Sequence, residues 1–306
     1  MVKKSVARGG RSKRIEKRLA KPTIDPCPPG QLGGAYKPLN EQDILQIYNT
    51  AVKLLENLGI GEVPERLFND LISIGAKDNG SGRVLFPKAL IELAINKAAK
   101  SFVLHGRDPE RSIEVGGDKV YFGTGGAAVQ TLDLYDGIYR PSTLEDLHNF
   151  TRLQDTLANI SWYTRCCIAT DITDVFDLDV NTVYALLKNT SKPMATSFTL
   201  ADNVKPIVDM LDIVAGGPGE FSKRPFLKAH ISPLISPMRY GEDAVEVVYE
   251  CIEHNIPISC ITAAQAGATA PATLAGFLAQ SLAETLASLI MVHAIKPGFP
   301  MVFSNW

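Results

Sequence analysis

The sequence has few cysteines and no uninterrupted apolar run long enough to span a membrane. Its five cysteines in 306 residues are scattered and odd in number, which favours reduced thiols in the cytoplasm over a disulfide framework. No apolar signal-peptide segment follows Met1, so secretion is not expected. The most apolar stretch, Leu274–Ile295, contains Glu284 and His293 and therefore predicts a buried helix rather than a membrane span.

Metal-ligand spacings and a nucleotide fingerprint are also missing. The five histidines show no ligand spacing, and the adjacent Cys166 and Cys167 point opposite ways on a strand, so we expect no bound metal. The glycine-rich segment Phe122–Ala128 resembles a dinucleotide-binding loop, but a hairpin-like sequence follows where that loop requires a helix. We therefore reject a nucleotide site and expect these glycines to allow close backbone approach at a barrel mouth.

Charge is nearly balanced overall but uneven along the chain. The net charge of −2 does not indicate a nucleic-acid partner. Basic side chains dominate residues 1–21, where Glu16 is the one acidic residue, and prolines and glycines are frequent in residues 22–38. We interpret residues 1–35 as a disordered basic, Pro/Gly-rich arm. An arm that contacts an acidic partner or a neighbouring subunit is the alternative.

The remaining chain predicts two units of an α/β protein. Residues 36–118 combine amphipathic helices with short strands, which is typical of a small α+β cap. From residue 119 onward, strands and helices alternate with short breaks, as in parallel βα units. About six strands precede Trp306, whereas a closed barrel needs eight. An open doubly wound sheet can stop at six, but a final strand without a covering helix favours an incomplete (β/α)8 TIM-type barrel over 119–306.

Several segments resemble one known family. They are Ser101–Ser112, Gly116–Asp133 (GGDKVYFGTGGAAVQTLD), His230–Met238 (HISPLISPM), Gln265–Gln280 (QAGATAPATLAGFLAQ) and Lys296–Phe303. Together they identify the chain as similar to the trimethylamine methyltransferase family, over most of residues 36–306. The resemblance implies a (β/α)8 barrel, in agreement with the strand pattern, and a chain that runs well past residue 306.

The resemblance also implies the chemistry. A Co(I) corrinoid on a separate corrinoid-binding protein takes a methyl group from trimethylamine or from a quaternary amine such as a betaine. The chain itself then holds no tightly bound cofactor, and its main contribution is to align the methyl carbon. A quaternary substrate needs no proton for its leaving group. We expect a cytoplasmic enzyme, and a homo-oligomer.

Candidate substrate residues are identified by the rule that barrel sites lie at the carboxyl ends of strands. Aromatic faces hold methylammonium cations, and Arg165 can pair with a carboxylate. Ordinary core packing of the aromatic rings and a surface ion pair of the arginine are the alternatives. The predicted substrate-binding residues are Trp162, Tyr163, Arg165, Phe198 and Trp306.

His230 is the predicted catalytic residue. Lys228, His230 and Ser232 alternate with apolar residues, so the polar set is expected to face the barrel lumen. A structural, hydrogen-bonded histidine is the alternative. Lys228 could form the Schiff base of a lyase or aldolase, although an ion pair with a carboxylate is the commoner fate of a buried lysine.

Two rim loops are predicted to face the corrinoid, through residues Gly125, Gly126, Gln265, Gly267 and Thr269. Free backbone N–H groups before the long helix could receive a carboxylate or a corrinoid amide. A tight strand-to-helix connection without a ligand is the alternative for the second loop. A non-catalytic barrel that binds methylated amines remains a third hypothesis for the whole chain.

Overall fold

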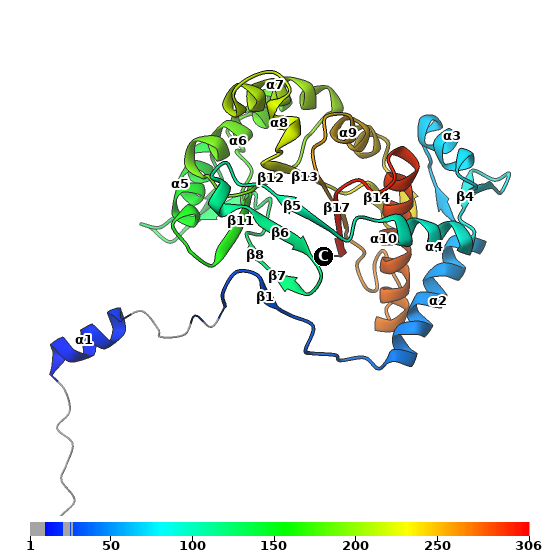
Figure 1. Cartoon of the computed structure of the whole chain (residues 1–306), viewed down its shortest axis with the longest axis horizontal. Coiled ribbons are helices and arrows are strands. Elements are labelled where there is room, and N and C mark those ends of the chain that lie inside the picture. Colours follow the sequence, from blue (N-terminus) through cyan, green and yellow to red (C-terminus); the bar gives the residue numbers. More distant parts are fainter. Residues whose placement is uncertain (1–9, 21–24, 26, 306) are drawn as a thin grey trace, which may run out of the picture.

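The central element of the computed structural model, which describes residues 10–20, 25 and 27–305, is a curled sheet of six parallel strands (Figure 1). The strands are β8 (Phe122–Gly123), β11 (Ile160–Thr164), β12 (Met194–Thr196), β13 (Leu227–Ile231), β16 (Ile258–Thr262) and β17 (Met301–Asn305). They lie in the order β17-β16-β13-β12-β11-β8, and every neighbouring pair is parallel. The predicted α/β class is confirmed: the sheet forms part of a barrel wall, with β8 and β17 at its edges.

Helices connect these strands and cover the outer face of the sheet (Figure 1). They are α5 (Leu144–Asp155), α6 (Val175–Asn189), α7 (Val204–Ala215), α8 (Glu220–Lys223), α9 (Glu242–Glu253) and α10 (Leu274–Ile295), with a short 3₁₀ turn, η2 (Ala201–Asn203). Alternate residues of β13 point to opposite faces, so Leu227 and Ala229 join the apolar core. Lys228 and His230 consequently share the concave face.

Residues 36–118 pack closely against the parallel-sheet part. They form α2 (Glu41–Asn57), α3 (Glu65–Ser73), α4 (Lys88–Lys97), η1 (Pro109–Arg111), β2 (Ile60–Gly61), β3 (Lys77–Asp78), β4 (Arg83–Leu85), β5 (Ser101–Leu104) and β6 (Ile113–Gly116). β2, β3 and β4 share a five-stranded sheet with β14 (Leu234–Ile235) and β15 (Arg239–Tyr240), which follow β13. The predicted cap is therefore joined to the rest by a common sheet.

The predicted N-terminal arm contains two short elements within its described residues. Helix α1 (Arg11–Leu19) stands away from the body, and β1 (Gln31–Leu32) pairs antiparallel with β7 (Lys119–Val120) (Figure 1). Backbone hydrogen bonds from Gly30 to Val120 and from Gly33 to Asp118 fix this part of the chain next to β7, just before β8.

The long helix α10 is a core helix. By length and composition it could span a membrane, but 72% of its most apolar window is buried inside the structure. It packs against α2, α3 and α4 as well as β16 and β17. Its one buried acid, Glu284, accepts hydrogen bonds from Ser236 Oγ at 2.6 Å and from the Met238 backbone N–H at 3.0 Å. Burial on all sides explains why its sequence is apolar all round.

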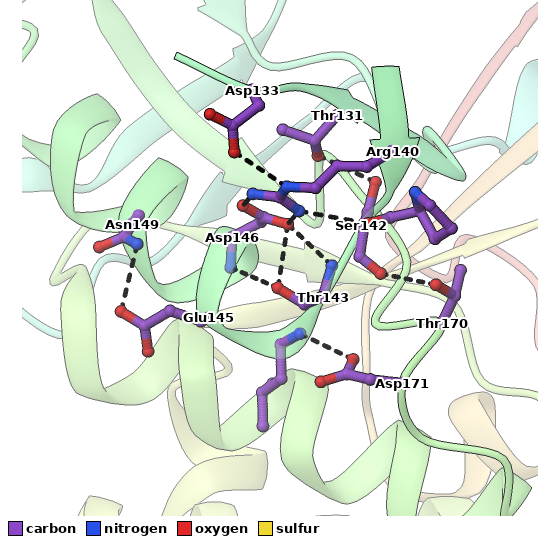
Figure 2. Close-up of polar contacts among 12 residues, drawn as sticks. Thr131, Asp133, Arg140, Ser142, Thr143, Glu145, Asp146, Asn149, Thr170 and Asp171 are labelled. Atoms are coloured by element: carbon purple, nitrogen blue, oxygen red, sulfur yellow. Dashed lines mark hydrogen bonds and ion pairs between the residues drawn. The ribbon is translucent and has the colours of Figure 1, made fainter. Parts of the chain in front are cut away.

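A hairpin of β9 (Gln130–Leu132) and β10 (Tyr139–Pro141) follows the glycine-rich loop, as predicted, and is fastened to α5 (Figure 2). The Arg140 guanidinium donates to both Asp146 carboxylate oxygens, at 2.6 and 2.8 Å, and to Asp133 at 3.0 Å. Asp146 also accepts from the backbone N–H of Thr143, completing the capping box that starts α5. This network fixes the hairpin that follows the glycine-rich loop against the start of α5.

We predict that Asp146→Asn lowers the free energy of unfolding at pH 7 by about 1 kcal/mol, measured by urea denaturation. Hydrogen bonds from Arg140 lower the pKa of the Asp146 carboxyl to about 2. The depressed pKa means that the contribution is present above pH 4 and is lost as pH falls towards 2. The difference from the native chain should therefore shrink over that window. Glu145→Gln, one residue away and exposed, is the control; equal losses for both variants would contradict the assignment.

Candidate functional site

A cavity of about 420 Å³ lies at the carboxyl ends of β11, β12, β13 and β16. This is the end at which parallel βα folds build their sites, because the loops there are free to vary. The loop after β8 and the first turns of α9 complete its wall. The lining residues are Gly126, Ala127, Thr164, Arg165, Ser197, Phe198, Thr199, His230, Ile231, Ser232, Asp243, Ala244, Val247 and Ile261.

Four of the predicted site residues meet in this cavity: Gly126, Arg165, Phe198 and His230. They come from separate segments that only the curled sheet brings together. Hydrogen bonds from the backbone N–H groups of Ala127 and Ala128 to the carbonyls of Arg165 and Cys166 tie the glycine-rich loop to the end of β11. The loop is thereby held against the residue that carries the cavity's guanidinium.

Arg165 is half-buried, and within the described residues no carboxylate lies at ion-pair distance from its guanidinium. The Asp179 carboxylate exerts a longer-range electrostatic effect on Arg165. Its oxygens accept hydrogen bonds from Thr199 and Asn203 instead. Burial lowers the pKa of Arg165, and Asp179 offsets part of that effect. The guanidinium is thus free to bind an anion that enters the cavity.

Below the cavity, Lys228 packs against His230 and Trp162. Lys228 Nζ lies 2.8 Å from His230 Nε2 and 4.2 Å from the centroid of the Trp162 ring. The Trp162 and His230 rings meet edge to face, with centroids 5.8 Å apart. The expected carboxylate partner of Lys228 is not found among the described residues. Lys228 instead makes a cation–π contact with Trp162 and a hydrogen bond with the His230 imidazole. One face of the Trp162 ring is therefore already occupied by the Lys228 amine.

Burial controls the protonation of both polar residues. Desolvation lowers the pKa of Lys228 to about 7. Desolvation, then the charges of Lys228 and Arg165, lower the pKa of His230 to about 3. The bottom of the site, formed by Lys228 and His230, therefore carries less positive charge at neutral pH than these residue types suggest.

Other predicted residues lie elsewhere. Tyr163 faces the helices, not the cavity, because neighbouring residues on a strand point to opposite sides. It is 1% exposed, and its hydroxyl lies 3.2 Å from Cys166 Sγ. Gly125, Gln265 and Gly267 are exposed, and Thr269 is half-buried. None of these four residues lines the cavity. Trp306 lies outside the described residues.

The second rim loop is a tight turn held by its own hydrogen bonds. The Gln265 carbonyl accepts from the backbone N–H groups of Ala268, Thr269 and Ala270, and the Gln265 N–H donates to Thr269 Oγ1. Gln280 of α10 donates to the Thr269 carbonyl at 2.8 Å and to Glu284 at 3.0 Å. The positive φ of Gly267, 80°, suits glycine in such a turn.

Sequence reasoning missed Thr199 and Asp243 in the cavity wall, whereas Ser232 belongs to the polar set that was expected to face the lumen. Asp243 had a usable signal, since it is an acidic residue in the first turn of the helix after β13. Thr199 lies three residues beyond the end of β12 and was detectable only by extending that strand end. Among the described residues, no three His, Cys, Asp or Glu side chains gather as a metal site would require.

Comparison with known proteins gives a consistent set of relatives. The family model described as trimethylamine methyltransferase matches residues 7–306. A glycine betaine methyltransferase of Desulfitobacterium hafniense (strain Y51) is 28% identical, covering 90% of this chain and 57% of that protein. A trimethylamine methyltransferase of D. hafniense (strain DSM 10664 / DCB-2) is also 28% identical, covering 87% and 53%.

A proline betaine:corrinoid methyltransferase of Eubacterium limosum is 25% identical, covering 88% of this chain and 56% of that protein. The chain therefore spans about half the length of the curated relatives that it matches.

We predict that the wild-type free energy of unfolding rises between pH 7 and 10 by up to about 1.4 kcal/mol per pH unit on account of Lys228. Its folded pKa is about 7 and its ordinary value is 10.5, so over that window the unfolded chain holds a proton that the folded chain has lost. Lys228→Met should remove this part of the slope in urea denaturation series, whereas exposed Lys53→Met should keep it. Parallel profiles for the wild type and Lys228→Met would contradict the burial argument.

Proposed function

The chain belongs to the trimethylamine methyltransferase family, and from that premise we propose that it moves a methyl group from a carboxylate-bearing quaternary amine to the Co(I) corrinoid of a separate protein. One observation carries the choice of substrate: the guanidinium of Arg165 reaches a cavity at the strand ends without a carboxylate partner among the described residues. Two of the relatives are named for glycine betaine and proline betaine, which supports the same class.

The cavity has groups for both ends of a zwitterion. Arg165 would hold the carboxylate by two parallel hydrogen bonds. Phe198 lines the same cavity and offers an aromatic face to the methylated ammonium, worth about 0.5–2 kcal/mol. Asp243, in the first turn of α9, adds a negative charge to the cavity wall. A methylammonium without a carboxylate would leave the Arg165 guanidinium without a direct partner, so such a substrate should bind less well.

Alignment is the chemistry that these residues contribute. Anchoring the carboxylate fixes the position of the nitrogen and hence of the methyl carbon that must face the acceptor. The leaving group of a quaternary amine is a neutral tertiary amine, so no residue has to supply a proton. The corrinoid, bound to its own protein, would supply the cobalt nucleophile.

The rim beside the cavity suits the approach of a flat macrocycle. Gly125, Gly126 and Ala127 in the loop after β8 are exposed, and so are Ala266, Gly267 and Ala268 in the loop after β16. Gly126 and Ala127 line the cavity, and their small size would leave its mouth open to a large partner. The predicted corrinoid-facing role of Gly125, Gly126, Gln265, Gly267 and Thr269 is retained as part of the proposal.

The wider architecture is proposed on the same basis. The curled six-stranded parallel sheet supports a TIM-type (β/α)8 barrel in which β8 and β17 pair with further strands. The division into an arm, a cap of residues 36–118 and a barrel from 119, a homo-oligomer, and a cytoplasmic location belong to this proposal as well.

Methyl transfer tests the proposal directly. With a reduced corrinoid protein, the chain should form methyl-corrinoid, followed by absorbance, from glycine betaine or proline betaine in preference to trimethylamine. Arg165→Gln should lower kcat/KM for the betaine about 100-fold, chiefly through KM, and Arg165→Lys should restore part of the loss. Arg152→Gln, on the exposed face of α5, is the matched control. An absence of methyl-corrinoid with every amine would refute the proposed activity.

Lys228 supports a second candidate function, that of a Schiff-base lyase or aldolase. Its lowered pKa provides a neutral amine near pH 7, which such chemistry requires. Borohydride should then trap a carbonyl compound on Lys228, detected as a mass increase on the peptide that contains it. If no adduct forms over a panel of aldehydes and ketones, this candidate is removed.

A further inference from the structure

We infer that Lys228 is a positioning residue: it holds His230 as the neutral tautomer with its proton on Nδ1, so that the ring donates a hydrogen bond into the cavity. The inference rests on the proposed function only for the identity of the acceptor, a substrate carboxylate. His230 then becomes a second anion-binding donor beside Arg165, and does not serve as an acid.

The first step is the hydrogen bond between the two side chains. Lys228 Nζ lies 2.8 Å from His230 Nε2. Below its pKa of about 7, Lys228 is an ammonium with three donors and no acceptor, so in that range the ring nitrogen that it meets must be the one without a proton. A neutral imidazole carries its single proton on the other nitrogen, which here is Nδ1. Because Nε2 is occupied, Nδ1–H is what His230 can present to a ligand in the cavity that it lines.

The second step is that Lys228 is itself held in place. The side chain is 5% exposed, and its amine rests on the Trp162 ring at 4.2 Å from the centroid. Strand β12 lies between β11 and β13, and its Ala195 is in register with Lys228 on one side and with Thr164, two residues after Trp162, on the other. A small side chain at this position suits the contact that Trp162 and Lys228 make across β12. The lysine is therefore clamped between an indole and an imidazole.

The third step is the electrostatic setting of His230. Two cationic groups act on the ring, Lys228 from the same strand and Arg165 from the position after β11. Their charges and burial keep the pKa of His230 near 3, so the ring stays neutral through the physiological range. Trp162 packs against it edge to face without adding a charge. A neutral Nδ1–H and the Arg165 guanidinium in one cavity match the two oxygens of a carboxylate.

Ring ¹⁵N NMR of the chain without corrinoid tests the inference, with the His230 signals assigned by their loss in His230→Gln. At pH 6, where Lys228 carries its proton, we expect the wild type to show the Nδ1–H tautomer, and we expect no protonation of His230 above pH 5. Lys228→Met should raise the His230 pKa by more than one unit and reduce the Nδ1–H population. Lys228→Arg, which keeps a donor and a charge, should preserve both signatures, and exposed Lys53→Met should match the wild type.

Kinetics provide the second readout. Lys228→Met should raise KM for the betaine about tenfold with a smaller change in kcat, since a substrate-binding donor loses its orientation. A wild-type ring protonated on Nε2 at pH 6, conversion of the ring to imidazolium near pH 6.5, or unchanged ¹⁵N signals in Lys228→Met would overturn the inference. Because the NMR needs no methyl transfer, an inactive chain with the expected tautomer would count against the proposed function alone.

Discussion

The site depends on two cationic side chains that have no carboxylate at ion-pair distance within the part of the chain that the structure describes. Arg165 directly follows β11, where the more distant Asp179 acts on it, and Lys228 lies on β13. Removing such groups from water is costly, so a fold keeps them where a ligand or a neutral partner compensates. Lys228 has a neutral partner in His230 and an aromatic one in Trp162. Arg165 has the more distant Asp179 and the open cavity, and we propose that an anionic group of the substrate is its direct partner.

The curled parallel sheet turns this local chemistry into a site. Its strands run in one direction, so their carboxyl ends, which carry Arg165, Phe198 and His230, lie on one edge. The hairpin network around Arg140 and the turn around Gln265 hold the loops at that edge. In the proposed function, the strands of the sheet would therefore bind and align the substrate, and the small residues of the loop after β8 would leave access for a large partner.

Sequence alone predicted the features that residue periodicity determines. It did not predict the features that depend on contacts between residues far apart in the sequence. The alternation of β13 placed Lys228 and His230 on the concave face. The same alternation argues against Tyr163 as a cavity residue once Trp162 faces inward, because neighbours on a strand point apart. The contact between Lys228 and Trp162 depends on the register of three strands and on the size of Ala195, which no local pattern contains. Likewise, the sheet shared by residues 36–118 with β14 and β15 arises from tertiary pairing.

The central claim is that this cavity recognises a carboxylate joined to a methylated ammonium. Isothermal titration calorimetry of the chain alone can compare glycine betaine with choline. Because both ligands carry the same trimethylammonium group, the difference in affinity measures the contribution of the carboxylate. The account predicts binding of glycine betaine at least about tenfold tighter than that of choline, as expected for one charge-assisted hydrogen-bonded pair. Equal affinity for the two ligands, or tighter binding of choline, would contradict it.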